Sequence, residues 1–131
     1  MDLKFPADLK YAPTHEWVRM DGDMATVGIS DYAQHKLGDI VYVELPVIGA
    51  VLEKGNAACE IESVKAVSEL FMPLTGEIVE TNGNIPDNPA FVNSSPYGEG
   101  WIMKIKVSNP DEIKNLLSVE KYQELIEKEE D

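Results

Sequence analysis

The segment NAACEIESVKAVSELFMP, residues 56–73, contains the pattern that decides the fold. Two strand-like runs, NAACEIES and AVSELFMP, follow each other with no glycine or proline between them. This arrangement predicts a β-hairpin with Val64 and Lys65 near its tip. A lysine at such a tip would extend its flexible stem into water.

The first of these runs alternates in a way that predicts one buried face. Ala57, Cys59 and Ile61 fall on the same side of an extended chain, opposite Ala58 and the glutamates. Cys59 is therefore expected to be a small core residue, with a reactive thiol as the alternative.

Further strands are predicted on both sides of the hairpin. HEWVRM and MATVGI surround the turn DGD and indicate a second hairpin, and the alternation of DIVYVELP predicts a strand with Val41, Val43 and Leu45 on its inner face. EIVETN and WIMKIKV indicate two more strands. Ser30 can cap a short helix that Gly38 ends.

The second half of the chain contains irregular and helical segments. Residues 82–100 are rich in Asn, Pro, Gly and Ser, which predicts a long irregular connection. After it, Asn109 can cap a helix with Pro110 in its first position, and Ser118 can start a second helix. The chain therefore predicts a mainly β sandwich or barrel with a short internal helix and a C-terminal helical tail.

Length, charge and cysteine content limit the possible functions. A chain of 131 residues is expected to form one domain. Its 11 basic and 24 acidic residues give a net charge of −13, which argues against nucleic acid or an anionic membrane as partner and favours a basic protein surface. One cysteine allows no internal disulfide, and no apolar run is long enough to span a membrane.

The first residues, MDLKFPADLK, lack the features of a signal or transit peptide, so we expect a cytoplasmic protein. We also expect a monomer, because no long apolar stripe stands out.

Motifs typical of enzymes are absent from the sequence. It contains no GxSxG, HExxH, Walker-type loop or GxGxxG. Of the two histidines, we expect His15 to be structural or near a surface cleft and His35 to be solvated on the short helix. No metal site is predicted, and a self-contained enzyme is disfavoured.

The residues around Lys65 suit a covalently attached carrier arm. Its small neighbours Ser63 and Ala66 leave the amine accessible to a modifying enzyme, and Glu62 and Glu69 form an acidic frame. An arm tethered at an exposed tip raises the local concentration of its cargo for successive partners.

Several segments, in order along the chain, carry a resemblance to a known family. They are YAPTHEWV, ATVGISDYAQ, LGDIVYVELP, ESVKA, PLTGEIVE and VNSSPYGEGWIMKIK, and together they cover residues 11–107 nearly continuously. The sequence resembles the glycine cleavage system H proteins, and the tail at 109–126 is similar to theirs as well. The resemblance implies a lipoyl-type barrel-sandwich hybrid as a single domain, 1–131, with a core at about 11–107 and helices at about 109–128.

The resemblance also implies a cofactor, partners and a role. Lipoate would be bound to Lys65 by an amide bond, within the attachment motif Glu62, Ser63, Val64 and Ala66. The chain would be a non-catalytic carrier of the aminomethyl group of glycine, from the pyridoxal-phosphate-dependent P protein to the tetrahydrofolate-using T protein. The L protein, dihydrolipoamide dehydrogenase, would reoxidise the arm, and a lipoate-attaching enzyme would load it.

A cleft that shelters the loaded arm would exclude water and hold the cationic amine. We hypothesise that Thr14, Glu16 and Glu69 line it, since the T-H-E cluster precedes a strand and Glu69 is close to the tip. Solvated edge acids are the alternative for these residues.

One segment departs from the family pattern, and three rival functions are compatible with the sequence. NGNIPDNPAFVN, residues 82–93, differs from the helix-compatible stretch usual in the family, which leaves the shape of that loop undetermined. The rivals are an H-like scaffold for lipoate assembly or relay, an unmodified interaction module and a biotin carrier. Biotinyl domains place Met on both sides of the lysine, whereas Val64 and Ala66 occupy those positions here.

Overall fold

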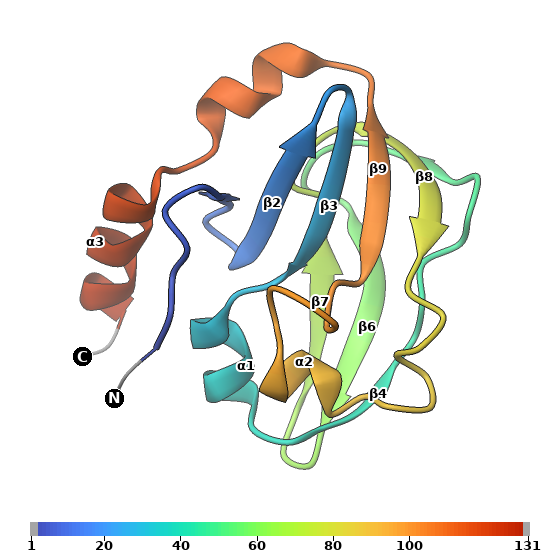
Figure 1. Cartoon of the computed structure of the whole chain (residues 1–131), viewed down its shortest axis with the longest axis vertical. Coiled ribbons are helices and arrows are strands. Elements are labelled where there is room, and N and C mark those ends of the chain that lie inside the picture. Colours follow the sequence, from blue (N-terminus) through green and yellow to red (C-terminus); the bar gives the residue numbers. More distant parts are fainter. Residues whose placement is uncertain (1–2, 130–131) are drawn as a thin grey trace.

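Two antiparallel sheets form the molecule, with three short helical segments and a C-terminal helix around them (Figure 1). The structure is a computed structural model that describes residues 3–129. The larger sheet has the strand order β1-β2-β3-β9-β8-β5, and the smaller sheet has the order β4-β6-β7. The predicted mainly β class, with an internal helix and a helical tail, is confirmed.

The elements have the following bounds. The strands are β1 Lys10–Tyr11, β2 Glu16–Asp21, β3 Met24–Ile29, β4 Ile40–Val43, β5 Val51–Leu52, β6 Ala57–Ser63, β7 Val67–Phe71, β8 Gly76–Thr81 and β9 Met103–Val107. The helices are α1 Asp31–Leu37, α2 Phe91–Ser94, the 3₁₀ helix η1 Pro110–Asn115 and α3 Val119–Glu129.

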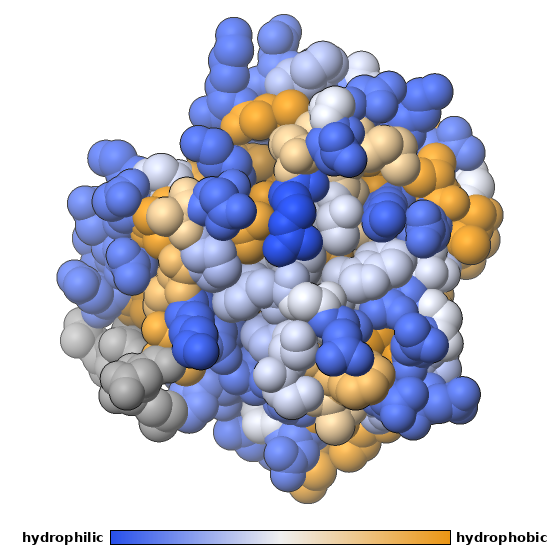
Figure 2. All heavy atoms as spheres, viewed as in Figure 1, coloured by the Kyte–Doolittle hydropathy of each residue, from blue (hydrophilic) through white to orange (hydrophobic). Residues whose placement is uncertain are grey.

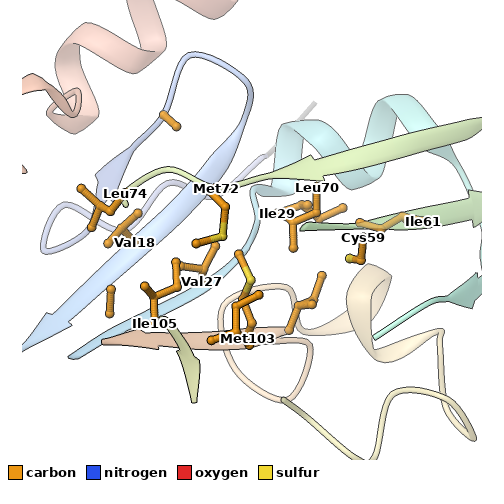
Figure 3. Packing of buried hydrophobic residues seen from close by; sticks show 14 of the residues in the cluster. Val18, Val27, Ile29, Cys59, Ile61, Leu70, Met72, Leu74, Met103 and Ile105 are labelled. Atoms are coloured by element: carbon orange, nitrogen blue, oxygen red, sulfur yellow. The ribbon is translucent and has the colours of Figure 1, made fainter. Parts of the chain in front are cut away.

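The main core lies between the two sheets, and Figure 3 shows its packing. Ile29, Cys59, Ile61 and Leu70 gather at one end of it, and Met72 and Met103 lie near its middle. The predicted burial of Cys59 and Ile61 is confirmed, and burial raises the pKa of the Cys59 thiol to about 12. The thiol is therefore protonated near neutral pH, as expected of a core cysteine.

Three side-chain predictions are wrong. Val41 is 51% exposed, because a bulge between Ile40 and Tyr42 in the pairing with β6 turns both Val41 and Tyr42 outward. Ala57 is exposed, because the pairing of β6 with β7 is irregular between Ala57 and Cys59. Asn109 precedes η1, but its side chain makes no capping hydrogen bond.

Ser30 and Gly38 bound α1 as the sequence predicts. The Ser30 hydroxyl accepts a hydrogen bond from the Ala33 N–H, and Gly38 has φ +80°, a conformation that glycine adopts without a side-chain penalty.

Two asparagines hold the long connection of residues 82–100, which contains the single helical turn α2. Asn82 donates to the carbonyls of Glu99 and Trp101, and Asn93 donates to the Gly38 carbonyl, at 2.8, 2.9 and 2.9 Å. The connection is irregular, as predicted, but side-chain hydrogen bonds fix its path next to the start of β4.

A second core lies between α3, the N-terminal segment and α1. Tyr11 and Tyr122 stack at its centre, with ring centroids 4.6 Å apart, and Phe5 packs edge-on against Tyr122. Tyr11 also exchanges two backbone hydrogen bonds with Leu117. These contacts place α3 beside the N-terminal segment, as Figure 1 shows.

The surface in Figure 2 is mostly hydrophilic, with separate apolar patches among charged side chains. Within residues 3–129, no helix is long and apolar enough to cross a membrane.

Gly76 provides a test of the packing between β8 and β9. A Cβ at this position would lie 2.2 Å from the Lys106 carbonyl oxygen, and backbone cannot move aside easily. We expect Gly76→Ala to lower the free energy of unfolding by about 1–3 kcal/mol in urea titrations. Gly83→Ala, where the added carbon meets nothing within 4 Å, is the matched control and should change stability by about 0.5 kcal/mol or less. Equal urea midpoints of unfolding for Gly76→Ala and Gly83→Ala would contradict this packing.

Candidate functional site

The β6–β7 hairpin holds the backbone of its tip at several points. The Ser63 N–H donates to the Ala66 carbonyl at 2.8 Å, and the Ala66 N–H donates to the Ser63 hydroxyl at 3.1 Å. The Val64 N–H donates to the carbonyl of Asp39, at 3.0 Å, which attaches the tip to the connection between α1 and β4. Lys65 is exposed. The tip is thus fixed while its lysine side chain faces solvent.

Apolar and acidic side chains surround Lys65. Val64 and Val67 are 74% and 61% exposed. Glu62, in the predicted attachment motif, is half-buried and pairs in register with Val67. A partner protein that approaches the lysine would meet both apolar surface and negative charge.

A cavity of about 220 Å³ begins close to this tip. Thr14, Glu16 and Glu69, the three residues predicted to line a cleft, all lie in its wall. The stem of Lys65 passes near Gly38, where an added Cβ would be 3.5 Å from the lysine Cε, and the preceding Leu37 lines the cavity. The other lining residues are His15, Ile29, Tyr32, Ala33, Lys36, Ile61, Ser68 and Glu129.

Glu16 is the buried acid of this cavity, with 1% of its surface exposed. The Thr14 hydroxyl donates to one of its carboxyl oxygens, and the Phe71 N–H approaches the other at 3.4 Å. Burial disfavours the charged form and raises the pKa of Glu16 to about 7, although both hydrogen bonds act in the opposite direction. A small change in its surroundings can therefore switch the carboxyl between neutral and charged near neutral pH.

Glu69 differs from Glu16 in its exposure. It lies on the edge strand β7, is exposed and lines the cavity. Of the two acids predicted to line a cleft, Glu16 is thus buried and Glu69 is exposed.

Sequence reasoning missed two charged residues of the cavity wall. Lys36 shares a face of α1 with Ala33 and Leu37, so the helical spacing from this apolar pair could have found it. Glu129 comes from the end of α3, and no local pattern relates it to the turn before β2. His15 lines the cavity, which confirms the expectation of a place near a surface cleft, and His35 is exposed, as predicted.

No group of three or more His, Cys, Asp or Glu side chains within residues 3–129 is arranged to hold a metal ion. The features described are a clamped tip, an exposed lysine and, beside it, a cavity lined by apolar and charged side chains. A β-sandwich with these features fits the class of carrier domains that hold a group on a flexible arm.

Comparison with known proteins specifies the class further. The family model for the glycine cleavage H-protein matches residues 9–129. A glycine cleavage system H protein of Bacteroides fragilis is 48% identical over 124 residues, 95% of this chain and 98% of the relative. One of Xylella fastidiosa is 52% identical over 126 residues, 95% of this chain and 96% of the relative. The crystal structure of the Mycobacterium marinum H protein has a TM-score of 0.86 and 35% identity, and covers 94% of this chain and 99% of that one.

The chain belongs to the glycine cleavage H-protein family. Proteins of this family are non-catalytic lipoyl carriers with lipoate attached covalently to a lysine. The predicted family, carrier class and cofactor are thereby confirmed. The family identity does not single out the lysine.

The pKa of Glu16 predicts how stability depends on pH. The folded state binds the Glu16 proton more tightly than the unfolded chain, where the ordinary pKa is 4.5. The stability that this proton contributes is full below pH 4.5 and is lost as the pH rises to about 7. Glu16→Gln, which stays neutral, should therefore match the wild type near pH 4 and exceed its free energy of unfolding by up to about 3 kcal/mol near pH 8.

Urea unfolding at several pH values measures this difference. Glu60→Gln removes an exposed acid of β6 and is the control for net charge. If the free energies of unfolding of wild type and Glu16→Gln changed in parallel between pH 4 and pH 8, Glu16 would not be buried as described.

Proposed function

We propose that Lys65 carries lipoate through an amide bond and that the chain shuttles the aminomethyl group of glycine from the P protein to the T protein. One observation carries the proposal: in a chain of the H-protein family, Lys65 stands exposed at a clamped hairpin tip beside a cavity. Its immediate neighbours Glu62, Ser63, Val64 and Ala66 form the attachment motif. The assignment of one domain, with a core at about 11–107 and helices at about 109–128, is part of the same proposal.

The hairpin suits the attachment of a long arm. When bound, lipoate supplies the disulfide that receives the aminomethyl group. The chain itself contributes a rigid platform, since hydrogen bonds of Ser63 and Val64 before the lysine and of Ala66 after it fix the backbone. A fixed tip with a flexible side chain directs the arm to a restricted volume, which includes the cavity and any enzyme docked at the tip.

The partners follow from this role. We propose that the P, T and L proteins and a lipoate-attaching enzyme meet the chain at the tip, where acidic charge and the exposed Val64 and Val67 offer a surface to a basic, partly apolar patch. The chain would act in the cytoplasm as a monomer.

The cavity can shelter a cationic amine. The buried Glu16 carboxyl, held by Thr14, would become charged when a cation binds beside it, because an opposite charge favours the ionised form. Glu69, which also lines the cavity, would add a second carboxyl. Charge-assisted hydrogen bonds from the amine and exclusion of water would then slow hydrolysis of the cargo.

The attachment site is tested by intact mass after incubation with a lipoate ligase, ATP and lipoate. We expect one lipoyl-sized increase in the wild type and none in Lys65→Arg, which retains the charge but lacks the primary amine. Lys54→Arg, at another exposed lysine, should be modified like the wild type.

Modification of Lys65→Arg would disprove the assignment, and an unmodified wild type with an active ligase would favour an interaction module. Reconstitution with P and T proteins then separates glycine cleavage from lipoate relay, since aminomethyl transfer is expected only in the former.

The cavity residues are tested by the lifetime of the aminomethyl group on the arm. Glu16→Gln with Glu69→Gln should shorten this lifetime by about tenfold or more, because two charge-assisted hydrogen bonds are lost. Formaldehyde release over time measures it. Glu60→Gln with Glu77→Gln removes two exposed acids outside the cavity and should leave the lifetime unchanged. Equal lifetimes for all these proteins would mean that Glu16 and Glu69 are solvated acids without this role.

A further inference from the structure

His15 connects the turn before β2 to α3. Its Nδ1 atom is 2.8 Å from the Tyr122 hydroxyl oxygen, and its Nε2 atom is 3.1 Å from a carboxyl oxygen of Glu129. The Tyr122 hydroxyl is also 2.6 Å from the Ser30 hydroxyl, which caps α1 by accepting the Ala33 N–H. One chain of hydrogen bonds therefore links the N-terminus of α1, the turn and α3.

When the His15 ring is neutral, one direction of donation along this series of hydrogen bonds gives every donor an acceptor. The Ser30 hydroxyl donates to Tyr122, the Tyr122 hydroxyl donates to Nδ1 of His15, and Nε2–H donates to Glu129. In the opposite direction, Nε2 would present a lone pair to the Glu129 carboxylate, so that two acceptors would face each other. The Ser30 hydroxyl, which is fully buried, would also lose the acceptor of its hydrogen. The geometry therefore places the ring proton on Nε2.

The backbone of His15 is held in an uncommon conformation. Its φ of +81° lies in the left-handed region, which residues other than glycine seldom adopt. Its N–H donates to the Ala12 carbonyl and its own carbonyl accepts the Ser30 N–H, each at 2.9 Å. Such a conformation persists where the surroundings fix it from several sides. The neighbours of His15 in the chain, Thr14 and Glu16, both line the cavity.

The C-terminal end of α3 takes part in the same site. Glu129 lines the cavity beside His15, and Tyr122 is fully buried in the second core, stacked on Tyr11. The ring of His15 also lies 5.1 Å from that of Tyr32 on α1. The turn is therefore enclosed by α1 on one side and α3 on the other.

We propose that His15 is a positioning residue, held by Tyr122 and Glu129 of α3, which fixes the turn so that Thr14 and Glu16 face the cavity. The helix α3 is then a wall of the site rather than a separate tail. The link to cargo lifetime rests on the proposed function, whereas the positioning itself does not.

Tyr122→Phe is the most direct variant, because it removes the hydroxyl and keeps the ring stacked on Tyr11. His15→Asn removes the imidazole but tolerates the positive φ. Both should loosen the turn and admit water to Glu16. In the unmodified protein, ¹³C NMR should then show the titration midpoint of Glu16 about half a pH unit or more below that of the wild type, nearer its ordinary value. Glu127→Gln, on an exposed part of α3, is the control and should leave the midpoint unchanged.

Long-range ¹H–¹⁵N NMR of the wild type reports the tautomer and should show the His15 proton on Nε2. In the lipoylated protein, Tyr122→Phe should shorten the lifetime of the aminomethyl group about fivefold, the effect of losing one hydrogen bond. A shifted Glu16 midpoint with an unchanged lifetime would support the positioning and count against the cavity as the place of the cargo. Unchanged midpoints in both Tyr122→Phe and His15→Asn, or a proton on Nδ1, would overturn the inference. If Tyr122→Phe does not fold, the Glu16 titration midpoint of Glu129→Gln is compared with that of Glu127→Gln in its place.

Discussion

The site depends on the short β6–β7 hairpin, which fixes the position of Lys65. Only three residues separate its two strands, and the N–H groups of Ser63, Val64 and Ala66 all donate hydrogen bonds around the tip. A tip this short cannot fold its lysine back into the core, so Lys65 is exposed. Because the Val64 N–H bonds to Asp39, the tip is also placed beside the end of α1, where the cavity begins.

The cavity combines two opposing requirements of a carrier. In the proposed function the Glu16 carboxyl would hold a cation, yet this carboxyl is buried, and burial alone would make a charged carboxylate costly. Glu16 reconciles the two with a pKa of about 7, which allows a neutral state in the empty cavity and a charged one beside a cation. The hydrogen bond from Thr14 keeps the carboxyl oriented in either state.

Much of the fold could be predicted from local patterns. The alternation of residues 57–71, the capping Ser30 and the glycine at 38 each specify a short element by rules that involve only near neighbours. The alternation around Val41 predicts the wrong face for this residue, because a bulge depends on the partner strand, which a single run does not reveal. The place of α3 was also beyond local rules, since it is set by contacts such as Tyr11 with Tyr122, over 100 residues apart in the chain. The polar T-H-E cluster before a strand indicates Thr14 and Glu16, and nearness to the tip indicates Glu69, whereas Glu129 has no comparable signal.

In the proposed function, an arm on Lys65 returns to the cavity beside its own hairpin. Nuclear Overhauser effects in the lipoylated protein loaded with a ¹³C-labelled aminomethyl group test this most directly. The account predicts contacts between the labelled methylene protons and the side chains of Ile29 and Ile61, which line the cavity. Narrow, solvent-like signals from the labelled group, with no contact to any residue of the cavity wall, would contradict it.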